Sequence, residues 1–130
     1  IAGVATALKA LKPGIRIIGI EPRGAPTHHA SRAAGELVTL DRIDTKAGTL
    51  APRRSEPLNF DLISRHVDEL VLVSDGAMEE AARWLWFECG IAAELSGAAA
   101  IAALQTRAVS IRPGETICAI ICGAGTDGMP

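Results

Sequence analysis

A cysteine followed by three small residues closes the most apolar segment near the end of the chain. The stretch reads TICAIICGAGTDG, residues 116–128, and at Cys122 the apolar run gives way to Gly123, Ala124 and Gly125. A thiol is a weak hydrogen-bond donor, and glycines let a flat ligand approach the backbone. From the spacing alone, Cys122 is interpreted first as a small buried hydrophobic residue, and the alternative is a thiol that donates to a ring nitrogen.

The other residues that bind metals or protons are dispersed. His28 and His29 are adjacent, whereas a metal-binding pair on one helical face needs i,i+4 spacing, so we expect both to be exposed. His66 stands alone and is interpreted as structural. A solvated position is also expected for the three lysines, Lys9, Lys12 and Lys46.

The three cysteines form no CxxC pair. A disulfide framework or a zinc site is therefore not expected, and reduced thiols favour a cytoplasmic location. Neither nucleic acid nor a membrane is expected as a partner, because the net charge is −2 and no apolar run is long enough to cross a bilayer. The first residues, IAGVATALKALKPG, start inside an apolar helical pattern without Met or a capping residue, so we interpret the chain as a piece of a longer protein.

Alternating elements must position these residues. Apolar-rich, β-branched segments predict strands at Ile15–Ile20, Glu69–Ser74 and Thr116–Ile121. Helical patterns fall at 2–12, 26–35, 60–67, 75–89 and 96–107, and a long polar connection spans 37–57. The order predicts an α/β fold with an open, mostly parallel sheet and helices on both faces. Ligands of such sheets bind at the carboxyl ends of strands, which here are near Glu21, Ser74 and Cys122.

Two helices carry further expectations about burial. The first helix has one apolar face, made by Val4, Ala5, Leu8 and Leu11. Trp84 and Trp86 are two residues apart and cannot share a helical face, so we expect one to pack in the core and the other to meet a neighbouring domain or subunit.

Four stretches in order carry a family resemblance: IAGVATALKALKPGIRIIGIEPRGAPTHHAS, GELVTLDRIDTKAGTLA, VDELVLVSDGAMEEAARWLWFECGIAAELSGAAAIAAL and CAIICGAGTDG. Together they resemble the C-terminal part of a threonine/serine dehydratase, a pyridoxal-phosphate enzyme with the tryptophan synthase β-subunit-like fold (fold type II). The resemblance implies that residues 1–130 belong to the large domain of a cytoplasmic, homo-oligomeric lyase. Its substrate would be L-threonine or L-serine, converted to a 2-oxo acid and ammonia.

The resemblance also implies roles for individual residues. Cys122 matches the position, Ser or Cys in the family, that faces the pyridine nitrogen of the cofactor. Gly123 and Ala124 match the glycines that follow it, and Glu94 matches a glutamate near the cofactor. Glu21 and Ala25 match positions that bind a divalent or monovalent cation in some relatives.

The chain departs from the family pattern at several positions. Leu95 stands where Pro is usual, and Thr27 replaces an acidic cation ligand. The family's ADG reads AGT at Ala47–Thr49, and the Asn of its SGGN is Gly125. These departures indicate a divergent branch or a different substrate.

The resemblance places the remaining active-site parts upstream. The Schiff-base lysine and the substrate-carboxylate loop match nothing in this chain, and the phosphate loop would come just before Ile1. No catalytic residue is therefore assigned here, and the isolated chain is expected to be inactive. Alternatives are another fold type II reaction, as in threonine synthase, cysteine synthase or serine racemase, and a non-catalytic α/β module.

Overall fold

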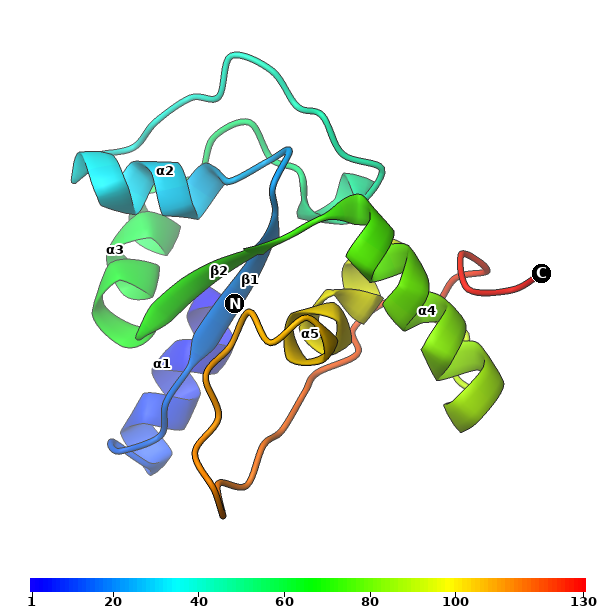
Figure 1. Ribbon diagram of the computed structural model, residues 1–130. Helices are drawn as coiled ribbons and strands as arrows, with labels where there is room; N and C mark the ends of the chain where they lie inside the picture. Colours follow the sequence, from blue (N-terminus) through cyan, green and yellow to red (C-terminus); the bar gives the residue numbers. More distant parts are fainter.

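Two parallel strands form the centre of the molecule (Figure 1). The computed structural model describes residues 1–130. Strands β1 (Ile18–Pro22) and β2 (Glu69–Val73) pair in register from Ile18 opposite Glu69 to Pro22 opposite Val73. The parallel pairing confirms the expected sheet type, although the first strand lies later in the sequence than the predicted Ile15–Ile20. No helix is long and apolar enough to cross a membrane.

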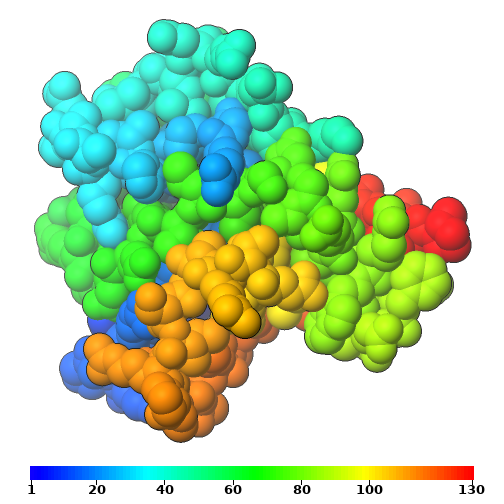
Figure 2. Space-filling view, viewed as in Figure 1, coloured from blue at the N-terminus to red at the C-terminus, as the bar shows by residue number.

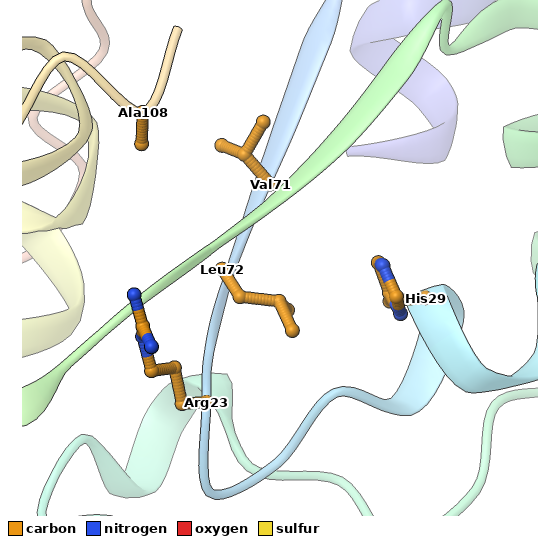
Figure 3. Close-up of a pocket in the computed structure, with 5 residues that line it drawn as sticks. All are labelled: Arg23, His29, Val71, Leu72 and Ala108. Carbon is orange, nitrogen blue, oxygen red and sulfur yellow. The ribbon is translucent and has the colours of Figure 1, made fainter.

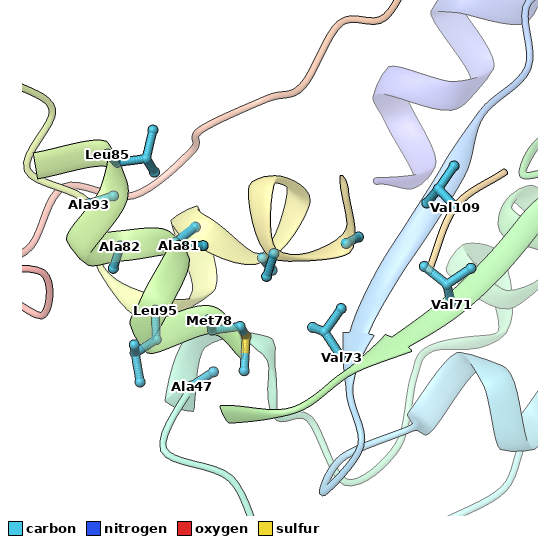
Figure 4. Close-up of a cluster of buried hydrophobic side chains, with 14 residues drawn as sticks. Ala47, Val71, Val73, Met78, Ala81, Ala82, Leu85, Ala93, Leu95 and Val109 are labelled. Atoms are coloured by element: carbon cyan, nitrogen blue, oxygen red, sulfur yellow. The ribbon is translucent and has the colours of Figure 1, made fainter. Parts of the chain in front are cut away.

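One face of the sheet carries the main hydrophobic core (Figure 4). Helices α4 (Asp75–Cys89) and α5 (Leu95–Gln105) pack against each other, and α5 contacts both strands. Ile20, Val71 and Val73 face this layer. Seven of the eleven residues of α5 are alanine, glycine or serine, so its backbone can lie close to the sheet.

A smaller core lies on the opposite face. Helices α1 (Ala2–Leu11) and α3 (Pro57–His66) enclose a cluster of four buried residues, Ala2, Ala5, Ile63 and Val67. Leu70 of β2 packs against this cluster, as expected from the alternation of side chains along a strand. Helix α2 (Thr27–Ala34) contacts α3 and both strands. The predicted helices on both faces are therefore confirmed.

The helix ends follow the sequence signals. The Ser74 hydroxyl accepts a hydrogen bond from the Ala77 amide (3.2 Å) and so caps α4. Gly90 ends α4, and Gly35 ends α2, both in the left-handed conformation with φ of 66° and 73°.

The third predicted strand, Thr116–Ile121, is wrong. Residues 116–122 run alongside α5 as an extended segment, and none of their backbone groups joins a backbone hydrogen bond. The nearest ladder contact is an isolated antiparallel bridge between Ala93 and Ala124. A strand exists only where a neighbour satisfies its amides and carbonyls, and this segment has no such neighbour.

The expectation that all three lysines are solvated is wrong for Lys9. Its ammonium forms an ion pair with Asp68 (2.8 Å) and donates to the Ile15 carbonyl (2.7 Å). The Lys9 side chain is 19% exposed. The contacts tie the end of α1 to the start of β2.

Apolar side chains on α1 and α4 also differ from expectation. Val4 and Leu11 are exposed, the latter by 84%, because α3 covers the side of α1 that carries Ala2 and Ala5. Neither tryptophan of α4 is buried in the main core. Leu85 lies there instead, Trp84 is 44% exposed, and Trp86 is half-buried. The chain-coloured surface in Figure 2 shows this end of α4 projecting beside the C-terminal residues.

Candidate functional site

The cysteine-glycine turn docks on the beginning of α5. We name residues 122–125 the 122–125 loop. The Glu94 amide donates to the Gly123 carbonyl (3.0 Å), and the Gly125 amide donates to the Ala92 carbonyl (3.2 Å). These two bonds hold the loop beside Glu94, the residue that precedes α5. The structure therefore brings together Cys122, Gly123, Ala124 and Glu94, which the sequence separates by nearly thirty residues.

Three glycines permit this close contact. A Cβ atom on Gly123 would lie 2.2 Å from Glu94 Oε1, and one on Gly125 would lie 2.7 Å from the Glu94 Cβ. A Cβ on Gly97 would lie 2.6 Å from the Gly123 carbonyl oxygen. The glycines of the loop are thus required by the packing of Glu94 and α5.

The Glu94 carboxylate receives one side-chain hydrogen bond. Thr49 Oγ1 donates to Glu94 Oε1 over 3.1 Å. Thr49 lies in a short 3₁₀ helix, η1 (Gly48–Leu50), within the long polar connection. Ala47, immediately before η1, is buried in the main core. Sequence reasoning missed Thr49, because nothing in a polar loop indicates which distant carboxylate it will meet.

A second set of contacts fixes the polar connection. Asp75, at the start of α4, accepts from the Thr45 hydroxyl (2.5 Å) and from the Lys46 amide (2.7 Å). The Lys46 ammonium lies 2.6 Å from Glu79, and the hydrogen bond to that carboxylate raises the pKa of Lys46. The connection thus reaches the site as an anchored segment.

Asp127 is another residue that sequence reasoning missed. Its carboxylate accepts from the Leu95 amide (2.8 Å) and so satisfies a free N–H at the first turn of α5. Beside it, the Ser96 hydroxyl is buried without a hydrogen-bond partner. A carboxylate shortly after a glycine-rich turn is the signal that could have suggested a cap.

The thiol of Cys122 is exposed, so its interpretation as a small buried hydrophobic residue is wrong. An accessible, neutral donor beside a backbone without bulky side chains fits the edge of a planar heterocycle. The residues present therefore suit the aromatic ring of pyridoxal phosphate. The contact between Cys122 and a ring nitrogen stays a prediction.

The residues matched to a cation site are engaged in internal hydrogen bonds. The buried Glu21 carboxylate accepts from the amides of His28 and His29, each at 2.8 Å, and so caps α2. The Ala25 carbonyl accepts from the Thr27 amide (3.0 Å). No group of three or more His, Cys, Asp or Glu residues in the chain is arranged to hold a metal ion. Cation binding by Glu21 and Ala25 stays a prediction.

The neighbouring histidines differ from each other. His29 is exposed as expected, whereas His28 is half-buried and its Nδ1 has no partner. Burial lowers the pKa of His28, and the nearby Glu21 carboxylate opposes that shift. The expectation that both rings are exposed is wrong for His28.

An open hollow of about 580 Å³ lies elsewhere, over the sheet. Figure 3 shows its five lining residues, Arg23, His29, Val71, Leu72 and Ala108. None of them belongs to the 122–125 loop or contacts Glu94. The hollow is therefore separate from the candidate site.

Comparisons with known proteins identify the family of the chain. Residues 1–123 match the family model described as pyridoxal-phosphate dependent enzyme. The chain is 36% identical to phenylserine dehydratase from Ralstonia pickettii, over 97% of this chain and 39% of that protein. It is 37% identical to serine racemase from Oryza sativa subsp. indica, over 79% of this chain and 30% of that protein.

A solved structure shows the same fold. The processed form of threonine deaminase isoform 2 from Solanum lycopersicum superimposes with a TM-score of 0.85 and 33% identity. The match covers 95% of this chain and 36% of that one. The fold is that of a fold type II α/β enzyme. The chain belongs to the pyridoxal-phosphate-dependent enzyme family, and it spans between 30% and 39% of the length of these relatives.

Proposed function

We propose that residues 1–130 are the C-terminal part of the catalytic domain of a longer pyridoxal-phosphate-dependent ammonia-lyase. The enzyme eliminates water from L-threonine or L-serine, and the aminoacrylate-type product then takes up water, releases ammonia and becomes a 2-oxo acid. The observation that carries the proposal is the docking of the 122–125 loop on Glu94, which places an exposed thiol and a carboxylate at one end of α5. Two of the relatives are named as a dehydratase and a deaminase of amino acids, and these names support the same class of reaction.

Each site residue has a part in this proposal. Cys122 meets the ring nitrogen as a neutral donor, and Gly123 and Ala124 let the ring lie close to the backbone. Glu94 borders the ring on the side of α5. Bound pyridoxal phosphate supplies the electron sink for the reaction. A neutral partner leaves the ring nitrogen free of a fixed proton, which favours loss of the β-hydroxyl over competing reactions.

Large apolar side chains on the surface support the idea of a longer enzyme. Trp84, Phe87, Ile117 and Ile120 are each more than two-fifths exposed. Contiguous exposed apolar groups generally mark surfaces that another part of a protein covers, and Trp84 and Phe87 are neighbours on one face of α4. The remaining catalytic-domain segment and a homo-oligomeric partner are the proposed covers.

The serine racemase relative supports a second reaction on the same site. A racemase shares the cofactor and differs in the fate of the substrate, because the α-proton is returned and the hydroxyl is retained. The two candidates are separated by their products. A lyase forms ammonia and a 2-oxo acid, whereas a racemase forms the D-amino acid.

The proposal is tested on the full-length protein that contains this segment. Purified protein with pyridoxal phosphate is given L-threonine or L-serine, and 2-oxo acid is measured by coupled reduction. We expect turnover by the full-length protein and none by the isolated 130-residue chain. Formation of 2-oxobutanoate by the isolated chain would contradict the proposal that residues 1–130 are only part of the catalytic domain.

Cys122 offers a matched pair of variants. Cys122→Ser keeps a small neutral donor and is expected to retain activity within about threefold, whereas Cys122→Ala removes the donor and lowers kcat about tenfold or more, because one hydrogen bond is lost. Equal activity of the alanine variant and the parent would remove Cys122 from the site.

A further inference from the structure

We infer that Thr49 is a positioning residue that orients the Glu94 carboxylate toward the 122–125 loop. The inference rests on the proposed function, because it gives Glu94 a place at the cofactor. It gives the polar connection a role in the site. In the family this connection contains the motif ADG, which this chain does not have. Thr49 lies in that altered stretch, AGT in place of ADG.

The contact between Thr49 and Glu94 has no competitor. The Thr49 hydroxyl is the one side-chain donor to the Glu94 carboxylate, and Glu94 forms no ion pair. Oε1, the oxygen that accepts from Thr49, is also the oxygen that would meet a Cβ on Gly123. The hydrogen bond therefore acts on the same atom that packs on the loop.

Glu94 needs such a restraint. Its side chain is half-buried at the start of α5 and has three rotatable bonds. A half-buried carboxylate gains by turning toward water unless a donor keeps it in place. Thr49 supplies that donor from outside α5, so the position of the carboxylate depends on the polar connection.

The polar connection is itself held in place, so it can fix the position of the Thr49 hydroxyl. Ala47 is 1% exposed in the main core, and the Leu50 amide donates to the Ala47 carbonyl (3.0 Å). On the preceding side, Asp75 holds the Thr45 hydroxyl and the Lys46 amide. The threonine is thus placed by backbone and core contacts that do not involve Glu94.

The experiment compares variants of the full-length protein. Thr49→Val removes the hydroxyl and keeps the branched shape, and Thr49→Ser keeps the hydroxyl. Each is made alone, and Thr49→Val is also combined with Glu94→Leu, which has no acceptor for the Thr49 hydroxyl. The readouts are the affinity for pyridoxal phosphate, measured by titration of its visible absorbance, and kcat and KM for the amino acid. The thermal midpoint of each variant reports on folding.

We expect Thr49→Val to weaken cofactor binding or lower kcat about tenfold, with KM for the amino acid nearly unchanged, because one hydrogen bond to a charged group is lost. Thr49→Ser should stay within about threefold of the parent. In the Glu94→Leu background, Thr49→Val should add little, because the contact is already lost and two residues that act through one contact are not additive. If Thr49→Val lowers the thermal midpoint, Thr49→Ala removes the same hydroxyl with less bulk and takes its place.

Three results would overturn the inference. One is a Thr49→Val protein equal to the parent in both readouts. Another is a Thr49→Ser protein as impaired as Thr49→Val. The third is a double variant whose defect is the product of the two single defects. A parent protein that neither binds pyridoxal phosphate nor converts amino acids would instead refute the proposed function, so the two failures are distinguishable.

Discussion

Strand β2 and the segment 116–122 are built from similar residues but reach different states. Both are short, apolar and rich in β-branched side chains. In β2, every residue pairs with β1, and helices cover both faces of the strand pair. Residues 116–122 are also extended, but they have no neighbouring strand, and Ile117, Cys118 and Ile120 are exposed.

The difference lies in the partners and not in the propensity. A β-branched side chain favours an extended backbone, and a strand further requires a second backbone at hydrogen-bonding distance. The segment is held at its end by Ile121, which packs on the main core, and by the 122–125 loop on α5. Its residues are therefore placed by the main core, whereas β2 is placed by its ladder.

The largest effect is expected at Met78, in the main core that covers β2 and leaves most of residues 116–122 exposed. This residue is completely buried where α4 meets the main core. Met78→Ala should lower the free energy of unfolding of the 130-residue chain by about 2–5 kcal/mol, because a cavity replaces the side chain. Chemical denaturation followed by circular dichroism measures the change. A loss below about 1 kcal/mol would mean that α4 and α5 do not form a common core with the sheet.

A smaller effect is expected where the 122–125 loop meets α5. In Gly97→Ala the new Cβ would press on the Gly123 backbone, so either the loop or the helix must shift. We expect a loss of about 1–3 kcal/mol in the free energy of unfolding, typical of overpacking. Gly76→Ala is the matched control, because a Cβ there meets no atom within 4 Å. Equal effects of the two substitutions would show that the loop is not seated on α5.

The ion pair at the start of β2 should contribute less. Burial alone would raise the pKa of the Asp68 carboxyl, but hydrogen bonds from Lys9 and from the Ile17 amide outweigh it and lower the pKa. A pKa below that of the unfolded chain contributes stability at neutral pH, and this contribution is lost as the pH falls below about 4. Because Asp68 is more than a third exposed, Asp68→Asn should cost less than about 1 kcal/mol at pH 7.

Unfolding measured at several pH values tests this contribution. The parent chain should lose stability below about pH 4 more steeply than Asp68→Asn, since the variant no longer carries the titrating group. Asp41→Asn, at an exposed position without an ion pair, is the control. Parallel curves for the parent and Asp68→Asn would assign the acid sensitivity to other groups.

The smallest effect is expected in the segment 116–122. Ile120 is 55% exposed, so Ile120→Ala should change the free energy of unfolding of the 130-residue chain by no more than about 0.5 kcal/mol. In the full-length protein the same substitution should cost about 2–5 kcal/mol, if a neighbouring strand covers the segment. The difference between the two contexts measures that cover. A large loss in the 130-residue chain would mean that the segment is already packed.

Elements that depend on local signals were predictable from the sequence. Ser74 and Gly90 set the two ends of α4, and Gly35 ended α2, because caps and left-handed turns act within a few residues. The absence of a third strand was not predictable, because residues 116–121 themselves do not show whether a neighbouring strand is present to pair with them. The prediction that one tryptophan of α4 packs in the core was wrong for a similar reason. The pattern shows which side chains are apolar, but it does not show which side of the helix is covered.

The candidate site could be predicted in part. The glycines after Cys122 indicated a close approach, and the structure shows that Glu94 is the group that approaches. Thr49 and Asp127 were out of reach, because their partners are 45 and 32 residues away along the chain. Contacts of this range follow from the fold and leave no trace in local spacing.

Helix α5 should respond to substitutions differently from most buried helices. Most interior helices fail when a bulky side chain is truncated, but α5 is buried through Gly97, Ala98, Ala99, Ala102 and Ala103, where almost nothing can be removed. Larger side chains should destabilise it, since each added methyl group must displace a neighbour in a closely packed interior. A library of all single substitutions should therefore show that the four alanine positions accept glycine or serine and reject valine and leucine, and that Gly97 rejects even alanine.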